Sequence, residues 1–294
     1  MNRQSVKKDY EELEFRDDFM FGKVMGDMDL CREVLECLLQ HPISELKEIQ
    51  TQREFKLTLE GKPIRVDVYT EDDEKKIYDA EMENLNHKSV EYHQLPRRSR
   101  FYQGSIDLGF LDKGNTYKML PDSSVLFICT FDPFEKGLSQ YTFRERCDED
   151  SKLLLGDGTM KVFYNCTYRG DDISDELKDL YEYVNHGRAK SQLTEKIDGA
   201  VQKARKNELW RGEYMKERAL FMDAREEGRE EGRTDLLVSQ VCKKLRKGKS
   251  IAQIADELEE DEIRIAVICK EAEKFAPEYD EEKVSEALGA LEGV

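Results

Sequence analysis

The chain has 294 residues, of which 38% are hydrophobic and 38% are charged, and its formal net charge is −17. That balance argues against non-specific binding of nucleic acid, so any such site has to be a local basic patch. The seven cysteines form no CxxC pair, which favours reduced, buried thiols over disulfides or zinc. No stretch approaches the ~20 apolar residues of a membrane span, and we expect a soluble, cytoplasmic protein with no membrane partner.

The N-terminal half predicts a helix, three strands, a helix and a strand. Apolar residues recur at helical spacing over residues 18–40, with a break at Gly26. A strand is predicted over 48–59, followed by a hairpin turn at Gly61. Two acidic strands then occupy residues 64–84.

Proline suits the first turn of a helix, so a helix is predicted from Pro96 to Gly114. The continuous apolar run at 123–131 predicts a buried central strand. Two further strands are predicted at 140–146 and 160–168.

The C-terminal part is charged and almost entirely helical. A helix is predicted over 174–183, and helices dominate after Ser191. Ser250 is a predicted N-cap for the first of two short helices, and the second begins near Glu260. We therefore expect three regions: an α/β domain (14–190), a charged linker or long helix (191–248) and a small helical hairpin with an acidic tail (249–294).

The acidic stretch 64–84, IRVDVYTEDDEKKIYDAEMEN, predicts two strands joined by a polar turn. By alternation, Asp67 shares one face of the first strand with Tyr69. Val66 and Val68 should share the other face. The turn acids at 71–74 are interpreted as solvated surface.

On the second strand, alternation places Asp79, Glu81 and Glu83 on one face. Converging carboxylates are costly unless a cation compensates them, and a divalent metal ion is the obvious candidate. Asp67, followed after thirteen residues by Glu81-Met82-Glu83, is typical of metal-dependent phosphodiesterases.

We expect Asp67 and Glu81 to bind one or two Mg²⁺ (or Mn²⁺) ions, with the main-chain carbonyl of Met82 as a further ligand. Such a metal polarises a phosphodiester and lowers the pKa of an attacking water. Glu83 would orient or deprotonate that water. The predicted catalytic residues are therefore Asp67, Glu81 and Glu83, and Asp79 is a candidate outer ligand.

Basic and polar side chains begin the helix that follows. They predict contacts to DNA phosphates beside the metal: Arg97, Arg98, Arg100, Tyr102 and Gln103. The alternative is a basic helical turn paired with the acidic strands, and the two interpretations are compatible. His87 and His93 are interpreted as surface residues.

The two short C-terminal helices have the spacing of a helix–turn–helix. The second opens with acidic residues at 260–262, which oppose phosphates. This favours a helical hairpin for protein contact, including a homo-oligomer, over one that reads DNA.

Three segments carry a resemblance to a known family: FRDDFMFGKVMGD, IRVDVYTEDDEKKIYDAEMEN and LPRRSRFYQGSIDLGFLDKGNTYKMLPDSSVLFICTFDPF. The chain resembles the Rpn family of recombination-promoting nucleases and transposase-like proteins, within the PD-(D/E)xK nuclease superfamily. The resemblance runs over residues 14–170. It implies an α/β fold with an αβββαβ core and a mixed sheet, followed by an extended α-helical C-terminal region.

The resemblance also implies a metal-dependent DNA endonuclease linked to recombination or transposition. Asp67 matches the motif's aspartate, Glu81 its Asp/Glu, and Glu83 falls at its lysine position. Relatives more often carry Gln there, so Glu83 is a departure, although some restriction enzymes of the superfamily use Glu. Two alternatives stay open: a nuclease fold of weak or no activity that serves as a DNA-binding or oligomeric module, and a ribonuclease or toxin-like nuclease.

Overall fold

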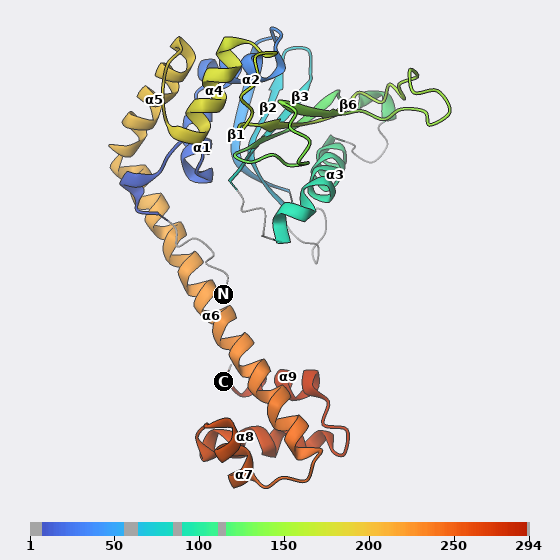
Figure 1. Cartoon of the computed structure of the whole chain (residues 1–294), viewed down its shortest axis with the longest axis vertical. Coiled ribbons are helices and arrows are strands. Elements are labelled where there is room, and N and C mark those ends of the chain that lie inside the picture. The colour runs from blue at the N-terminus through green and yellow to red at the C-terminus, as the bar shows by residue number, and fades with distance from the viewer. Residues whose placement is uncertain (1–7, 56–63, 85–89, 111–115, 293–294) are drawn as a thin grey trace. The chain divides into compact units, whose positions relative to one another are not determined.

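The structure is a computed structural model that describes residues 8–55, 64–84, 90–110 and 116–292 (Figure 1). The chain divides into two compact units after Tyr214. The first unit is α/β and the second is helical. The division falls within a single long helix, α6 (Glu208–Leu245).

The first unit is built on a six-stranded sheet with the order β1-β2-β3-β4-β6-β5. Its strands are β1 (Leu46–Phe55), β2 (Ile64–Asp72), β3 (Ile77–Glu83), β4 (Ser123–Cys129), β5 (Gln140–Phe143) and β6 (Thr159–Asn165). The β3–β4 and β4–β6 pairs are parallel and the other pairs are antiparallel, so the sheet is mixed, as predicted. Every residue of β3 is buried, because helices cover both faces of the sheet.

Four helices pack on one face of the sheet and one on the other (Figure 1). The first face carries α1 (Asp18–Met25), α2 (Met28–Leu39), α4 (Asp175–His186) and α5 (Gln192–Arg205). The opposite face carries α3 (Val90–Phe110), which connects the parallel strands β3 and β4 as such neighbours require. Short 3₁₀ turns lie at Tyr10–Glu12, Tyr117–Met119 and Glu273–Phe275.

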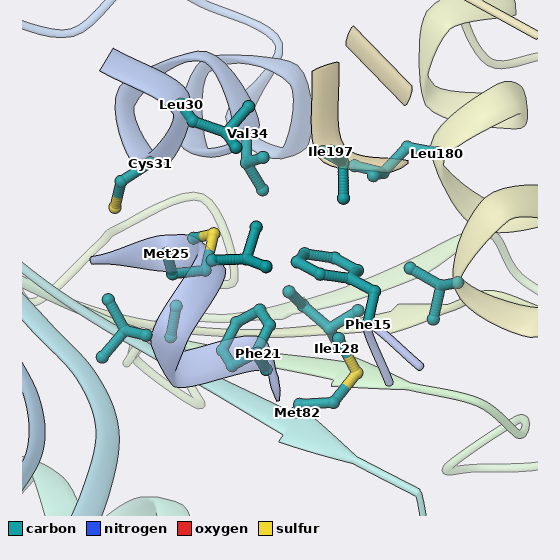
Figure 2. Close-up of a cluster of buried hydrophobic side chains, with 14 of the residues drawn as sticks. Phe15, Phe21, Met25, Leu30, Cys31, Val34, Met82, Ile128, Leu180 and Ile197 are labelled. Carbon is teal, nitrogen blue, oxygen red and sulfur yellow. The ribbon is translucent and has the colours of Figure 1, made fainter. Parts of the chain in front are cut away.

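The face under α1, α2, α4 and α5 is mainly apolar in its interior. Figure 2 shows Met82 and Ile128 of the sheet lying against helix residues such as Phe21 and Met25. Burial of such side chains contributes about 25 cal/mol per Å² of apolar surface, so this layer is the main stabilising element of the unit.

The predicted order of elements in the N-terminal half is confirmed. The helix break lies where expected, since Asp27 ends the turn at Gly26 and caps α2 by accepting the Leu30 amide at 3.0 Å. The predicted hairpin turn at Gly61 and the end of the next helix at Gly114 lie outside the described residues.

The predicted start of α3 is wrong. The helix begins at Val90, and Pro96 lies inside it. A proline there removes one backbone hydrogen bond and crowds the preceding turn. Leu95 in that turn is 1% exposed within the core, so tertiary packing holds the helix across the proline.

The second unit joins the end of α6 to three short helices, α7 (Ile251–Leu258), α8 (Glu262–Ala272) and α9 (Glu281–Glu292). Val238, Ile254 and Ile265 are central to its apolar core. The predicted cap at Ser250 is confirmed as a capping box with Gln253. Among the described residues, no helix is both long and apolar enough to cross a membrane.

All seven cysteines of the chain are free thiols, and all except Cys147 are buried. Burial raises the pKa of Cys31 and of Cys37 to about 12. Both thiols are therefore uncharged core residues at neutral pH.

Candidate functional site

The two central acids of the predicted motif meet where the β2–β3 ladder ends. Regular pairing stops at Val68 and Ala80. Beyond that pair, the Asp67 amide donates to Glu81 Oε1 at 2.7 Å, and the Met82 amide donates to Asp67 Oδ2 at 3.0 Å. Each carboxylate thus binds the backbone of the strand that carries the other. This reciprocal exchange fixes both carboxylates at one point between the strands.

An irregularity in β1 lies directly beside this point. Gln52 has φ +56°, a left-handed conformation that is costly for a non-glycine residue in a strand. Its side-chain amide lies 3.4 Å from Asp67 Oδ1, and Arg65 donates to its carbonyl oxygen. Sequence analysis missed Gln52, because no local pattern distinguishes it from the other polar residues of the strand.

The prediction that Val66 and Val68 share a face is wrong. Val68 packs in the apolar cluster under α1, whereas Val66 packs with Phe55 on the α3 side. The alternation of side chains therefore reverses at Asp67. The β1–β2 register is the same on both sides of this point, from Thr51↔Val68 to Arg53↔Val66.

Asp79 is fully buried, and among the described residues its carboxylate oxygens accept no hydrogen bond from an N–H or hydroxyl group; its hydrogen-bonding neighbour is the carboxyl group of Glu81. It lies on the α3 side of β3, two residues before Glu81. Burial, followed by the charge of Asp67, raises the pKa of Asp79 to about 8. A buried carboxylate that accepts no such hydrogen bond is costly, so this position calls for a proton or a cation.

Glu81 and Glu83 are 2% and 3% exposed, and both face the guanidinium of Arg98 from α3. The distance from Arg98 Nη1 to Glu83 Oε1 is 2.6 Å, and that from Nη2 to Glu81 Oε2 is 3.7 Å. Arg98 Nη2 also donates to the Tyr102 hydroxyl at 3.0 Å. Although burial lowers it, the carboxylate of Glu83 holds the pKa of Arg98 above its ordinary value.

The acids of the cluster influence one another strongly. Burial raises the pKa of Asp67 to about 6, against the lowering effect of the Met82 amide. Burial and the charges of Asp67 and Asp79 raise the pKa of Glu81 well above its usual range. Without an added cation, the cluster therefore retains protons at neutral pH.

Asp18, exposed in the first turn of α1, also contributes to the field at the site. Its charge is among the causes that raise the pKa of Asp67. Sequence analysis placed Asp18 in a helix without assigning it to the site. The link requires the packing of α1 against the sheet.

One of the turn acids was misinterpreted. Asp72 is 1% exposed, whereas Asp73 and Glu74 are exposed as predicted. Its oxygens accept the Lys76 amide at 2.9 Å and the Tyr78 hydroxyl at 3.0 Å. Asp72 is therefore a structural residue that closes the β2–β3 turn.

The predicted phosphate-contacting residues occupy different environments on α3. Arg97 and Arg100 are exposed, and the Arg98 side chain is 27% exposed. Tyr102 and Gln103 are buried: the Tyr102 ring stacks on Phe127, and Gln103 donates to the Ser123 hydroxyl at 2.6 Å. His93 is exposed, and His87 lies outside the described residues.

The donor chemistry of the cluster suits a hard divalent cation, since it consists of carboxylate oxygens and includes the fully buried Asp79. Within the described ranges, no three or more Asp, Glu, His or Cys side chains are already arranged to hold a metal. The reason is visible: backbone amides bind Asp67 and Glu81, and Arg98 binds Glu83. Met82 turns its side chain to the apolar face, and its carbonyl stays a predicted ligand.

Comparisons with known proteins identified no relative. No family model, no curated protein and no solved structure matches the chain.

Proposed function

We propose that the chain is a metal-dependent phosphodiesterase of the PD-(D/E)xK type that cleaves DNA. The observation that carries the proposal is the carboxylate cluster of β2 and β3. It joins the reciprocal Asp67–Glu81 exchange to a fully buried Asp79, whose neighbour among the described residues is another carboxyl group, that of Glu81. A cluster of this composition binds an added cation favourably, and burying its carboxylates without a cation costs free energy.

In this proposal Asp67 and Glu81 hold the metal ion. When bound, the ion polarises the phosphodiester and lowers the pKa of a water molecule. Asp79 lies on the same face of β3, and once it has lost its proton its negative charge strengthens cation binding. Cation binding displaces protons from these groups, so we expect affinity to rise with pH through the pKa of Asp67, about 6, and that of Asp79, about 8.

The choice of DNA as substrate rests on the resemblance to recombination-promoting nucleases. The exposed Arg97 and Arg100 of α3, in the same helix as Arg98, supply local positive charge of the kind that phosphates require. The net charge of −17 makes such a local patch necessary.

The test is cleavage by the purified full-length chain with Mg²⁺ or Mn²⁺, on supercoiled plasmid, single-stranded DNA and RNA. We expect nicking of plasmid DNA that EDTA abolishes. Asp67→Asn and Glu81→Gln should reduce it to background while the circular dichroism spectrum is unchanged. Asp73→Asn, which alters an exposed acid of the adjacent turn, is the matched control and should cleave like the wild type.

Equal cleavage by Asp67→Asn, Glu81→Gln and wild type would refute the assignment. Cleavage of RNA alone would make the chain a ribonuclease built on the same site. A second candidate, a nuclease fold that binds metal and DNA without turnover, is favoured by one observation: Glu83, the predicted water-activating residue, is bound to Arg98. Metal binding without cleavage of any substrate would support it.

A further inference from the structure

Arg98 is the cation that the carboxylate cluster contains. Its guanidinium lies 2.6 Å from Glu83 Oε1 and 3.7 Å from Glu81 Oε2. Both carboxylates are almost fully buried, so these charges attract one another in a poorly screened environment. The guanidinium therefore offsets part of the cost of burying the cluster.

Aromatic side chains also hold the Arg98 guanidinium in place. It lies over the rings of Tyr102 and Phe127, 5.4 Å and 5.8 Å from their centroids, and donates to the Tyr102 hydroxyl at 3.0 Å. Stacking and hydrogen bonding together stabilise a single position of a long side chain. The arrangement is a latch, by which we mean Arg98 bound to Glu81, Glu83 and Tyr102.

A guanidinium and a divalent ion draw on the negative charge of the same carboxylates and repel one another at this distance, so each weakens the binding of the other. Glu81 is a proposed metal ligand, and one of its oxygens already accepts the Asp67 amide while the other faces Arg98.

We propose that Arg98 and a divalent cation compete for the carboxylates of Glu81 and Glu83, so that metal binding opens the latch and frees the guanidinium for a substrate phosphate. The inference rests on the metal site of the proposed function and adds its regulation. The side chain is 27% exposed, so the freed guanidinium has a path toward solvent on the helix that also exposes Arg97 and Arg100. Glu83 then serves to hold Arg98 in the metal-free state.

Competition makes the two binding events interdependent. The apparent affinity for metal is reduced by the fraction of molecules in which the latch is closed. A phosphate that binds Arg98 removes the competitor, so metal and substrate should each increase the affinity for the other by the same factor.

The test measures Mn²⁺ affinity of the full-length chain by calorimetry, with no substrate and no turnover. Arg98→Met keeps the length of the stem and removes the competing charge. We expect it to bind Mn²⁺ about tenfold or more tightly than the wild type, since couplings of this kind span about 5- to 150-fold. Arg98→Lys should lie between them.

Removing any positive charge strengthens cation binding slightly, so two variants separate the latch from that general effect. Tyr102→Phe changes no charge and deletes one hydrogen bond to the guanidinium, and should tighten Mn²⁺ binding about fivefold. Arg100→Met removes an exposed charge from the same helix and should change affinity by less than about twofold.

A substrate-linked readout completes the design. Arg98→Met should bind metal more tightly yet cleave about a hundredfold more slowly, as expected when a donor to the reacting phosphate is lost. A residue with only a structural role would weaken both properties. Equal or weaker Mn²⁺ binding by folded Arg98→Met and Tyr102→Phe, in a wild type that does bind, would refute the latch. Failure of the wild type to bind Mn²⁺ at all would refute the metal site itself.

Discussion

Strand β3 has two buried faces of opposite chemistry. Tyr78, Ala80 and Met82 lie toward α1 in the apolar cluster. After Ile77, the side chains toward α3 are carboxylates: Asp79, Glu81 and Glu83. All six are at most 7% exposed. The exclusion of water stabilises the apolar face. Bound protons and the charge of Arg98 stabilise the acidic face. Burial alone therefore does not distinguish a core position from a site position in this strand.

The largest loss of stability should follow when a carboxylate is placed on the apolar face of β3. Ala80→Asp places a carboxylate among apolar side chains at a position that is 1% exposed. An uncompensated buried charge costs about 3–5 kcal/mol, so urea unfolding should show a severe loss of stability. Asp79→Ala, one residue away, should change stability far less, because it removes a carboxyl group whose burial is itself costly. Similar losses of stability in both variants would show that the two faces of β3 do not differ in this way.

The acidic face should make stability depend on pH. Burial raises the pKa of Asp79 to about 8, so the folded state holds a proton that the unfolded chain has already released above about pH 4. Stability is then fully present at low pH and falls as pH rises toward 8, by at most about 1.4 kcal/mol per pH unit for each such proton. Urea unfolding in EDTA at several pH values measures the slope. Asp79→Asn should flatten it, and an unchanged slope would exclude Asp79 as its source.

Divalent cations should offset this loss at the acidic face. At about one hundred times its Kd, Mn²⁺ should stabilise the folded chain by about 2.7 kcal/mol near pH 8. Protons compete for the same carboxylates, so the gain should shrink near pH 5. Thermal unfolding with and without Mn²⁺ provides the measurement. The Asp67→Asn, Glu81→Gln double variant should show no gain; a gain equal to that of the wild type would place the cation elsewhere.

The smallest change in stability should follow when the contact between Gly22 of α1 and Gln52 of β1 is altered. A Cβ at Gly22 of α1 would lie 3.3 Å from Gln52 Nε2, so Gly22→Ala should displace the side chain that contacts Asp67. We expect weaker Mn²⁺ binding, with a small net change in stability because the gain in helix propensity offsets the displacement. Gly104→Ala on α3 is the control, since its Cβ would meet nothing within 4 Å and should stabilise the helix by about 1 kcal/mol. Unchanged Mn²⁺ affinity in Gly22→Ala would show that Gln52 does not position Asp67.

The strands and most helices could be predicted because their signals are local. Alternation predicted the positions of β2 and β3, although it failed for the faces of β2 at Asp67, and a continuous apolar run predicted β4. The start of α3 could not be predicted, because packing of Leu95 overrides the preference of Pro96 for a first turn. The burial of Asp72 was equally hidden, since its partners Lys76 and Tyr78 lie across the turn.

At the site, the motif predicted which acids share a face of β3 and left their partners undetermined. The position of Arg98 depends on how α3 crosses the sheet, and a basic residue near acids in sequence predicts no specific contact. The role of Gln52 beside Asp67 is even harder to predict from the sequence. Strand propensity opposes its left-handed conformation, and its contact with Asp67 joins two separate strands.

The two faces of the sheet also differ in how far along the chain their parts lie, with a consequence for synthesis. The acidic face is assembled from Gln52, β2, β3 and Arg98, all in the first third of the sequence. The apolar face is complete only after α4 and α5 have been synthesised. The Tyr10 hydroxyl, for example, donates to the carbonyl of Ala204, 194 residues later. As the ribosome extends the chain, the carboxylates can meet Arg98 long before the opposite face is covered. We expect the nascent chain to expose that apolar layer until α5 emerges, which makes this interval the one in which chaperones bind.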